Sequence, residues 1–182
     1  MSCGGHSTFF RFGCLFLLMA LILDVIGVAA PYWIYGEANG LKVYAGLWKQ
    51  CLSANTPDLK ISKCTEYGDV PDWFKSVRAS GLLGIFISVI ALISAILKIR
   101  FKDRVFVLII VIILSFLSAV CTMVSIAVYA GKYHASEKYS SFVKFSFAFA
   151  FCAVSIVLSA IAGICMIIEL SKRSSYTTIV GR

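Results

Sequence analysis

Cys51 and Cys64 are the only two cysteines of the chain's seven that share one polar segment, and they offer its clearest chemistry. Oxidation would join them across 12 intervening residues, and closing such a loop contributes about 3 kcal/mol to folding. Disulfides persist in oxidising compartments. We therefore predict a disulfide if the segment lies outside the cytosol, the alternative being two free thiols.

No other part of the sequence combines the residue types that catalysis or metal binding needs. His6 and His134 are the two histidines, and the membrane spans described below place them on opposite sides, where they cannot share a metal ion. The sequence contains no phosphate-binding glycine loop, nucleophile elbow or metal-ligand spacing. We expect no enzyme activity, no cofactor and no metal site.

The other cysteines are expected to have different roles. Cys121, Cys152 and Cys165 lie within apolar runs and are predicted to pack against neighbouring helices. Cys14, at the edge of the first apolar run, and Cys3 before it are candidates for palmitoylation.

The composition is that of a membrane protein. Of the 182 residues, 60% are hydrophobic and 14% are charged, against roughly 45–50% and 25% in soluble domains. A helix needs about 20 apolar residues to cross the bilayer core. Four stretches qualify and predict a single tetraspan domain over residues 1–182. Its predicted spans are 12–30, 79–97, 105–130 and 145–170, its loops are 31–78, 98–104 and 131–144, and its tail is 171–182.

The net charge of +8 serves topology rather than nucleic-acid binding. Lysine and arginine are densest near the termini and in the loop 98–104, and such segments stay in the cytosol. We predict cytosolic termini, the lipid bilayer as partner, and no nucleic acid, because no soluble basic face exists. The run before Val28-Ala29-Ala30 resembles a signal peptide, but Pro31 and Asp24 favour an uncleaved span.

The loop 31–78 has the pattern of a folded structure. Residues 32–35 are rich in β-forming types, and Asn39-Gly40 is typical of a hairpin turn. Residues 41–51 alternate apolar and polar side chains, which predicts one half-buried strand. The disulfide would fasten it to a second strand at 61–65, and 71–78 reads as the start of a helix. These patterns predict an all-α membrane protein, a left-handed four-helix transmembrane bundle with a small disulfide-stapled extracellular antiparallel β-sheet.

Trp33, then Gly46-Leu47-Trp48, then Cys51 and Cys64 form a W…GLW…C…C pattern between spans one and two. The chain resembles the superfamily of claudins, peripheral myelin protein, epithelial membrane proteins and lens fibre protein. The resemblance covers essentially the whole chain. It implies an arginine just before span two, where Arg78 lies, and a signature that holds the extracellular domain together. The residues themselves suggest tryptophans at the membrane–water boundary and a close backbone approach at Gly46.

Other features concern the branch of this superfamily. The loop 31–78 lacks an Asn-x-Ser/Thr sequon, and the chain does not end in a hydrophobic residue, so binding to a PDZ domain is not expected. The stretch around Asp24 and the Tyr129-x-x-Lys132-Tyr133 sequence resemble the PERP branch of desmosome-associated tetraspans.

Asp24 is an acid within the first span, and such residues usually face the bundle interior. We expect a structural role, either an ion pair, with Arg78 as the natural partner, or a carboxyl group hydrogen-bonded to a neighbouring helix. The functional alternative is a residue of an ion pathway or a switch.

These features favour a structural protein of the plasma membrane at cell–cell junctions. It would act through its extracellular domain and through lateral self-association, in cis and in trans, with junctional or other membrane proteins as further partners. Small residues at four-residue spacing could pack within one molecule or between copies; they are Ala91, Ala95, Ser155, Ser159 and Gly163. The alternatives are a regulatory tetraspan (an auxiliary subunit, a trafficking factor or an apoptosis-related factor) and a paracellular ion barrier or pore.

Overall fold

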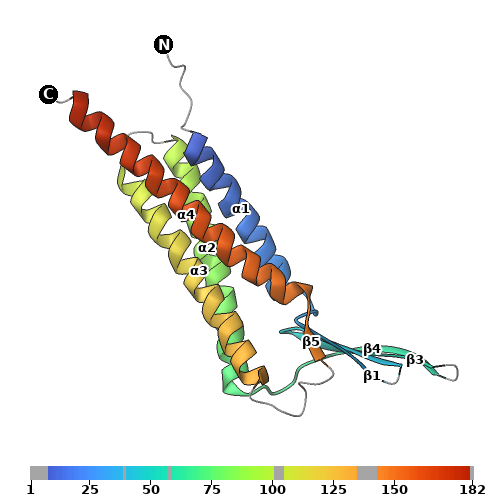
Figure 1. The fold of residues 1–182 in the computed structure, drawn as a ribbon. Coiled ribbons are helices and arrows are strands. Elements are labelled where there is room, and N and C mark those ends of the chain that lie inside the picture. The colour runs from blue at the N-terminus through green and yellow to red at the C-terminus, as the bar shows by residue number, and fades with distance from the viewer. Residues whose placement is uncertain (1–7, 39, 57–58, 101–104, 135–142, 181–182) are drawn as a thin grey trace.

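The computed structural model describes residues 8–38, 40–56, 59–100, 105–134 and 143–180. It contains a bundle of long helices with a small β-sheet at one end (Figure 1). His6, Asn39 and residues 101–104 of the basic loop, about which the sequence gave predictions, lie outside the described residues.

Four helices among the described residues are long and apolar enough to cross a membrane. Each begins before or ends after the apolar run that predicted it, because polar residues at the span ends continue the helical hydrogen bonding. α2, for example, begins at Asp72 and includes Arg78. The helices are α1 (Thr8–Ala29), α2 (Asp72–Arg100), α3 (Val105–His134) and α4 (Phe147–Val180).

The helices pack through small side chains in the interior and present large apolar side chains outside. α1 packs mainly on α4, and α2 mainly on α3. Ala91 and Ala95 of α2 are fully buried, and Ser155 and Ser159 of α4 are at most 3% exposed. The small-residue faces are thus used within one molecule, and any lateral contact between copies needs another surface.

The sheet has five antiparallel strands in the order β4-β3-β2-β1-β5. The hairpin between the first two strands has a two-residue turn, since Ala38 pairs with Leu41, and Gly40 adopts a positive φ of 77°. The strands are β1 (Ile34–Ala38), β2 (Leu41–Ala45), β3 (Lys49–Thr56), β4 (Leu59–Glu66) and β5 (Val143–Phe145).

Two details of the sheet differ from the sequence prediction. The single strand predicted over 41–51 is two strands, β2 and β3, because the chain reverses at Gly46–Trp48 and sends the side chains of Leu47 and Trp48 toward the helices. The loop 131–144, for which no strand was predicted, supplies β5 to the edge beside β1. Three residues carry too short a pattern to predict a strand.

The predicted disulfide is present between β3 and β4. Cys51 and Cys64 are bonded, and they lie directly opposite each other in the strand register. The disulfide therefore fastens the edge strand β4, at the side of the sheet away from β5, to its neighbour β3.

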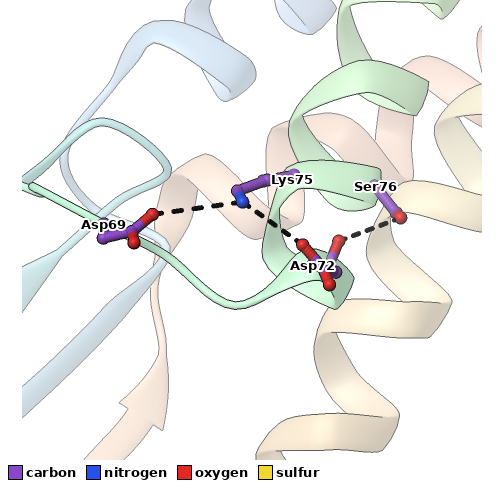
Figure 2. A network of polar contacts seen from close by, with 4 residues as sticks. All are labelled: Asp69, Asp72, Lys75 and Ser76. Carbon is purple, nitrogen blue, oxygen red and sulfur yellow. Dashed lines mark hydrogen bonds and ion pairs between the residues drawn. The ribbon is translucent and has the colours of Figure 1, made fainter.

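Polar contacts fix the beginning of α2 where the chain leaves the sheet. Lys75 Nζ lies 3.2 Å from Asp72 Oδ1 and 4.0 Å from Asp69 Oδ1, and Ser76 Oγ donates a hydrogen bond to the Asp72 carbonyl (Figure 2). All of these side chains are exposed, so each ion pair contributes at most about 1 kcal/mol. They lie where the chain passes from β4 into α2.

Replacing both bonded cysteines (Cys51→Ser with Cys64→Ser) should lower the stability of the sheet by about 3 kcal/mol, because the unfolded chain regains its loop entropy. We expect a lower unfolding temperature in detergent and retention inside the cell. Cys165→Ser, which removes a free thiol, is the control. Surface delivery and an unfolding temperature equal to those of the control would show that the disulfide is dispensable.

Candidate functional site

The signature residues gather where the sheet meets the helices, and we call the group Trp33, Gly46, Leu47, Trp48 and Arg78 the sheet root. Trp33 and Leu47 are fully buried there. Arg78 and Trp48 are partly buried. The group thus links the sheet to α1 and α2.

Trp33 fills the centre of the sheet root. Its ring packs edge-on against Tyr129 of α3 at 4.8 Å and Phe149 of α4 at 5.7 Å between centroids. Its backbone N–H donates to the Ala45 carbonyl, and its own carbonyl accepts from the Ser146 N–H, both at 2.9 Å. Trp33 is therefore a core residue that joins three helices to β2, and not a member of an exposed interfacial belt.

The two tryptophan indoles cap the end of α1. Trp33 Nε1 donates to the Gly27 carbonyl at 2.7 Å, and Trp48 Nε1 donates to the Val28 carbonyl at 2.9 Å. The last carbonyls of a helix have no partner within the helix, and Gly27 and Val28 are buried away from water. The indoles supply those missing donors.

Gly46 allows the chain to pass over the end of α1. A Cβ atom at this position would lie 2.5 Å from both the Ala30 carbonyl oxygen and the Pro31 Cα. Both are backbone atoms that cannot move without displacing α1 or the sheet. The close approach predicted from the sequence is thus present, and it lets Leu47 and Trp48 reach the helices.

Arg78 holds the sheet root from α2. Its Nε donates to the Leu47 carbonyl at 2.7 Å. Its guanidinium carbon lies 5.0 Å from the ring centroid of Trp48 and 4.9 Å from that of Phe74. Tyr67 is also near, at 5.7 Å; burial raises the pKa of Tyr67, and the positive charge of Arg78 opposes that rise.

Asp24 is buried in the middle of the bundle and joins three helices. Its two carboxyl oxygens accept hydrogen bonds from Thr122 Oγ1 of α3 at 2.9 Å and Ser155 Oγ of α4 at 2.8 Å. Of the two structural alternatives, the structure has the carboxyl bonded to neighbouring helices. The other alternative, an ion pair with Arg78, is not formed, because the Leu47 carbonyl and the aromatic rings at the sheet root hold the arginine.

Sequence reasoning missed these partners of Asp24, although the signal was present. Ser115, Ser118, Thr122 and Ser125 recur at three- and four-residue spacing along α3, and all are buried. Such spacing places them on one helix face. A polar face in an apolar span indicates where a buried acid finds its hydrogen bonds.

The remaining predicted site residue, Cys14, lies at the opposite end of the bundle. Its thiol is half-buried beside Phe10, Arg11 and Ile99, far in sequence from the sheet root. Within the described residues, no group of three potential metal ligands comes together. The arrangement is a scaffold in which polar groups hold helices and sheet in place.

A family model described as PMP-22/EMP/MP20/Claudin matches residues 7–166. The chain belongs to this family. It is a multi-pass membrane protein of a structural tetraspan family, embedded in a lipid bilayer.

A relative supports the branch that the sequence suggested. The chain is 25% identical over 136 residues to a Danio rerio protein described as "p53 apoptosis effector related to PMP-22". The match covers 74% of this chain and 70% of the relative. Both the family resemblance and the PERP-like branch inferred from short stretches are in line with this match.

Arg78→Lys should destabilise the sheet root although it conserves the charge, because lysine lacks the planar guanidinium that stacks on the rings and donates through Nε. A loss of about 2 kcal/mol is expected from the cation–π and hydrogen-bond contributions. The measurement is thermal unfolding in detergent, with Arg100→Lys at the exposed far end of α2 as control. Equal unfolding temperatures for the two variants would contradict this role.

Asp24→Asn should change stability little, because an amide can accept from one hydroxyl and donate to the other. Asp24→Leu should cost about 1–2 kcal/mol, since it removes both hydrogen bonds at similar volume. Unfolding temperatures of the two variants, compared with Ser155→Ala, test this. If Asp24→Asn were as damaging as Asp24→Leu, the bundle would require the negative charge itself.

Proposed function

We propose that the protein is a plasma-membrane tetraspan whose sheet faces the extracellular space and whose termini are cytosolic. The first turn of α1 and the last turns of α4 lie at the same end of the bundle, opposite the sheet (Figure 1). A sheet that carries a disulfide fits an oxidising compartment. The dense lysine and arginine near the other end fit retention in the cytosol.

We further propose that it is a structural protein of cell–cell contacts, and a single observation carries this proposal. The sheet extends to one side of the bundle (Figure 1). One of its faces exposes apolar side chains. Exposed apolar patches mark interaction surfaces. The sequence predicted a half-buried β2, and only its inner end is buried, at Ala45.

The strand register puts the apolar side chains on one face. Val43 of β2 lies opposite Leu52 of β3. Ala54, two residues after Leu52 on β3, pairs with Leu41 of β2 on one side and with Ile61 of β4 on the other. Directly paired residues share a face, and residues two apart on a strand do as well. We call the group Leu41, Val43, Leu52 and Ile61 the apolar sheet face; its members are 36–47% exposed.

We propose a second copy of the chain as the partner of the apolar sheet face. A hollow of about 280 Å³ adjoins Val43 and Leu52, with Lys63 and Thr65 at its side. The ion pairs Lys42–Glu37 and Lys49–Glu66 lie on the other face of the sheet, as the strand register shows. The apolar centre of this face can pack against an identical face, while Lys63, exposed on the edge strand β4, stays in water. Because the small-residue faces of the helices are buried, contact in cis also needs the sheet or the lipid-facing side chains.

Imaging of mixed cultures tests the adhesive function. If the sheet contacts a copy on the opposing cell, the tagged protein should concentrate at borders where both cells express it, and not where only one does. Ile61→Glu should reduce this enrichment several-fold by charging the apolar sheet face. Ser62→Glu, on the other face of the same strand, should leave it unchanged. Uniform distribution of the normal protein over the surface would refute the proposal.

A second function is supported by the relative described as a p53 apoptosis effector. The chain would then be a regulatory tetraspan related to cell death, acting through another membrane protein. Induced expression should in that case raise the fraction of dying cells, and a stoichiometric partner should co-purify. Adhesion without any effect on survival would favour the first function.

A further inference from the structure

A groove lies between α1 and α2 at the end of the bundle away from the sheet. Its lining comprises Phe10, Arg11 and Cys14 of α1 and Ile99 of α2, and its volume is about 280 Å³. The lining is apolar except for the guanidinium of Arg11 and the thiol of Cys14. Ile99 is 46% exposed and Arg11 is exposed, so the groove opens on the outer surface of the bundle, where lipid lies.

Among the residues that the structure describes, the exposed charged side chains at this end of the bundle have one sign. Arg11, Arg100 and Lys172 are exposed at this end. Lys172 Nζ lies 4.0 Å above the ring of Phe9, which brings a positive charge from α4 to the start of α1. The acid at this end among the described residues, Glu169, is 3% exposed. Exposed acids of the described chain lie instead at the sheet, at Glu37, Glu66, Asp69 and Asp72.

The groove also lies at the depth where a phospholipid changes from headgroup to chain. The apolar helix begins at Thr8, so Arg11 lies in its first turn. Cys14 lies three residues deeper, about 4.5 Å along the axis. An arginine at the end of a span extends its charge to the headgroups while its stem stays in the apolar region. Arg11 is therefore placed to meet a phosphate while Phe10, Cys14 and Ile99 meet an acyl chain.

We propose that this groove binds an anionic phospholipid, with its phosphate on Arg11 and the first part of an acyl chain between α1 and α2. The positive charge of Arg100 and Lys172 on either side of α1 selects a headgroup with net negative charge. With the orientation proposed above, the lipid belongs to the cytosolic leaflet, where anionic lipids are concentrated. The binding does not depend on the adhesive function, and nanodiscs test it whatever the orientation.

The experiment uses the full chain in nanodiscs of phosphatidylcholine with a minor share of phosphatidylserine, followed by mass spectrometry of the lipids that stay bound. Phosphatidylserine should be enriched several-fold over its share in the bilayer. Arg11→Gln should abolish the enrichment and Arg11→Lys should retain it. Lys132→Gln, which removes an exposed charge at the other end of the bundle, is the matched control.

Filling the groove separates lipid binding from a general attraction of charges. Cys14→Trp keeps every charge but occupies the space of the chain, so the enrichment should fall as it does in Arg11→Gln. Ile99→Phe serves the same purpose if the first variant does not fold. Equal enrichment in the filled variants, or equal loss in Lys132→Gln, would overturn the proposal. So would an acyl group on Cys14, released by hydroxylamine, because that chain would itself occupy the groove.

Discussion

Two indole N–H groups at the end of α1 support the arrangement of the whole molecule. The last carbonyls of α1 have no partner within the helix and are buried, and Trp33 and Trp48 reach back from the sheet root to bond those of Gly27 and Val28. Each indole can reach its carbonyl only if the chain between them folds as the hairpin β1–β2 and turns at Gly46. The capping of one helix therefore fixes the place of the sheet. Arg78 then connects that place to α2 through the carbonyl of Leu47.

The bundle interior uses the same principle away from the sheet. Asp24 receives its hydrogen bonds from α3 and α4, so a polar group that would be costly alone becomes a link among three helices. Buried polar links of this kind specify which helices are neighbours, whereas apolar contacts are satisfied by lipid as well as by protein. The small residues of α2 and α4 then permit the close approach that these bonds require.

The sequence was sufficient for much of this fold, and the reasons for its failures are physical. Apolar runs predicted the four helices, and the presence of two cysteines in one polar segment predicted the disulfide Cys51–Cys64. Both predictions follow from local composition. The reversal at Gly46–Trp48 was missed because residues 41–47 alternate as one strand does. Their alternation ends where tertiary contacts with Ala30 and Pro31 take over. For Asp24 the sequence left open both an ion pair with Arg78 and a hydrogen bond to a neighbouring helix. The hydroxyls that bond it, on Thr122 and Ser155, lie 98 and 131 residues away in sequence.

The position of β5 in the sequence determines the order in which parts of the protein can fold during synthesis. Strands β1 to β4 and the disulfide lie within residues 34–66, so the ribosome completes them early. The edge strand β5, and the rings of Tyr129 and Phe149 that enclose Trp33, come from the second half of the chain. During synthesis the sheet thus exists with its central tryptophan uncovered until α3 and α4 have entered the membrane. β5 can pair beside β1 only after α3 has crossed the membrane, so a chain that stops before this point keeps an open sheet edge that other proteins can bind.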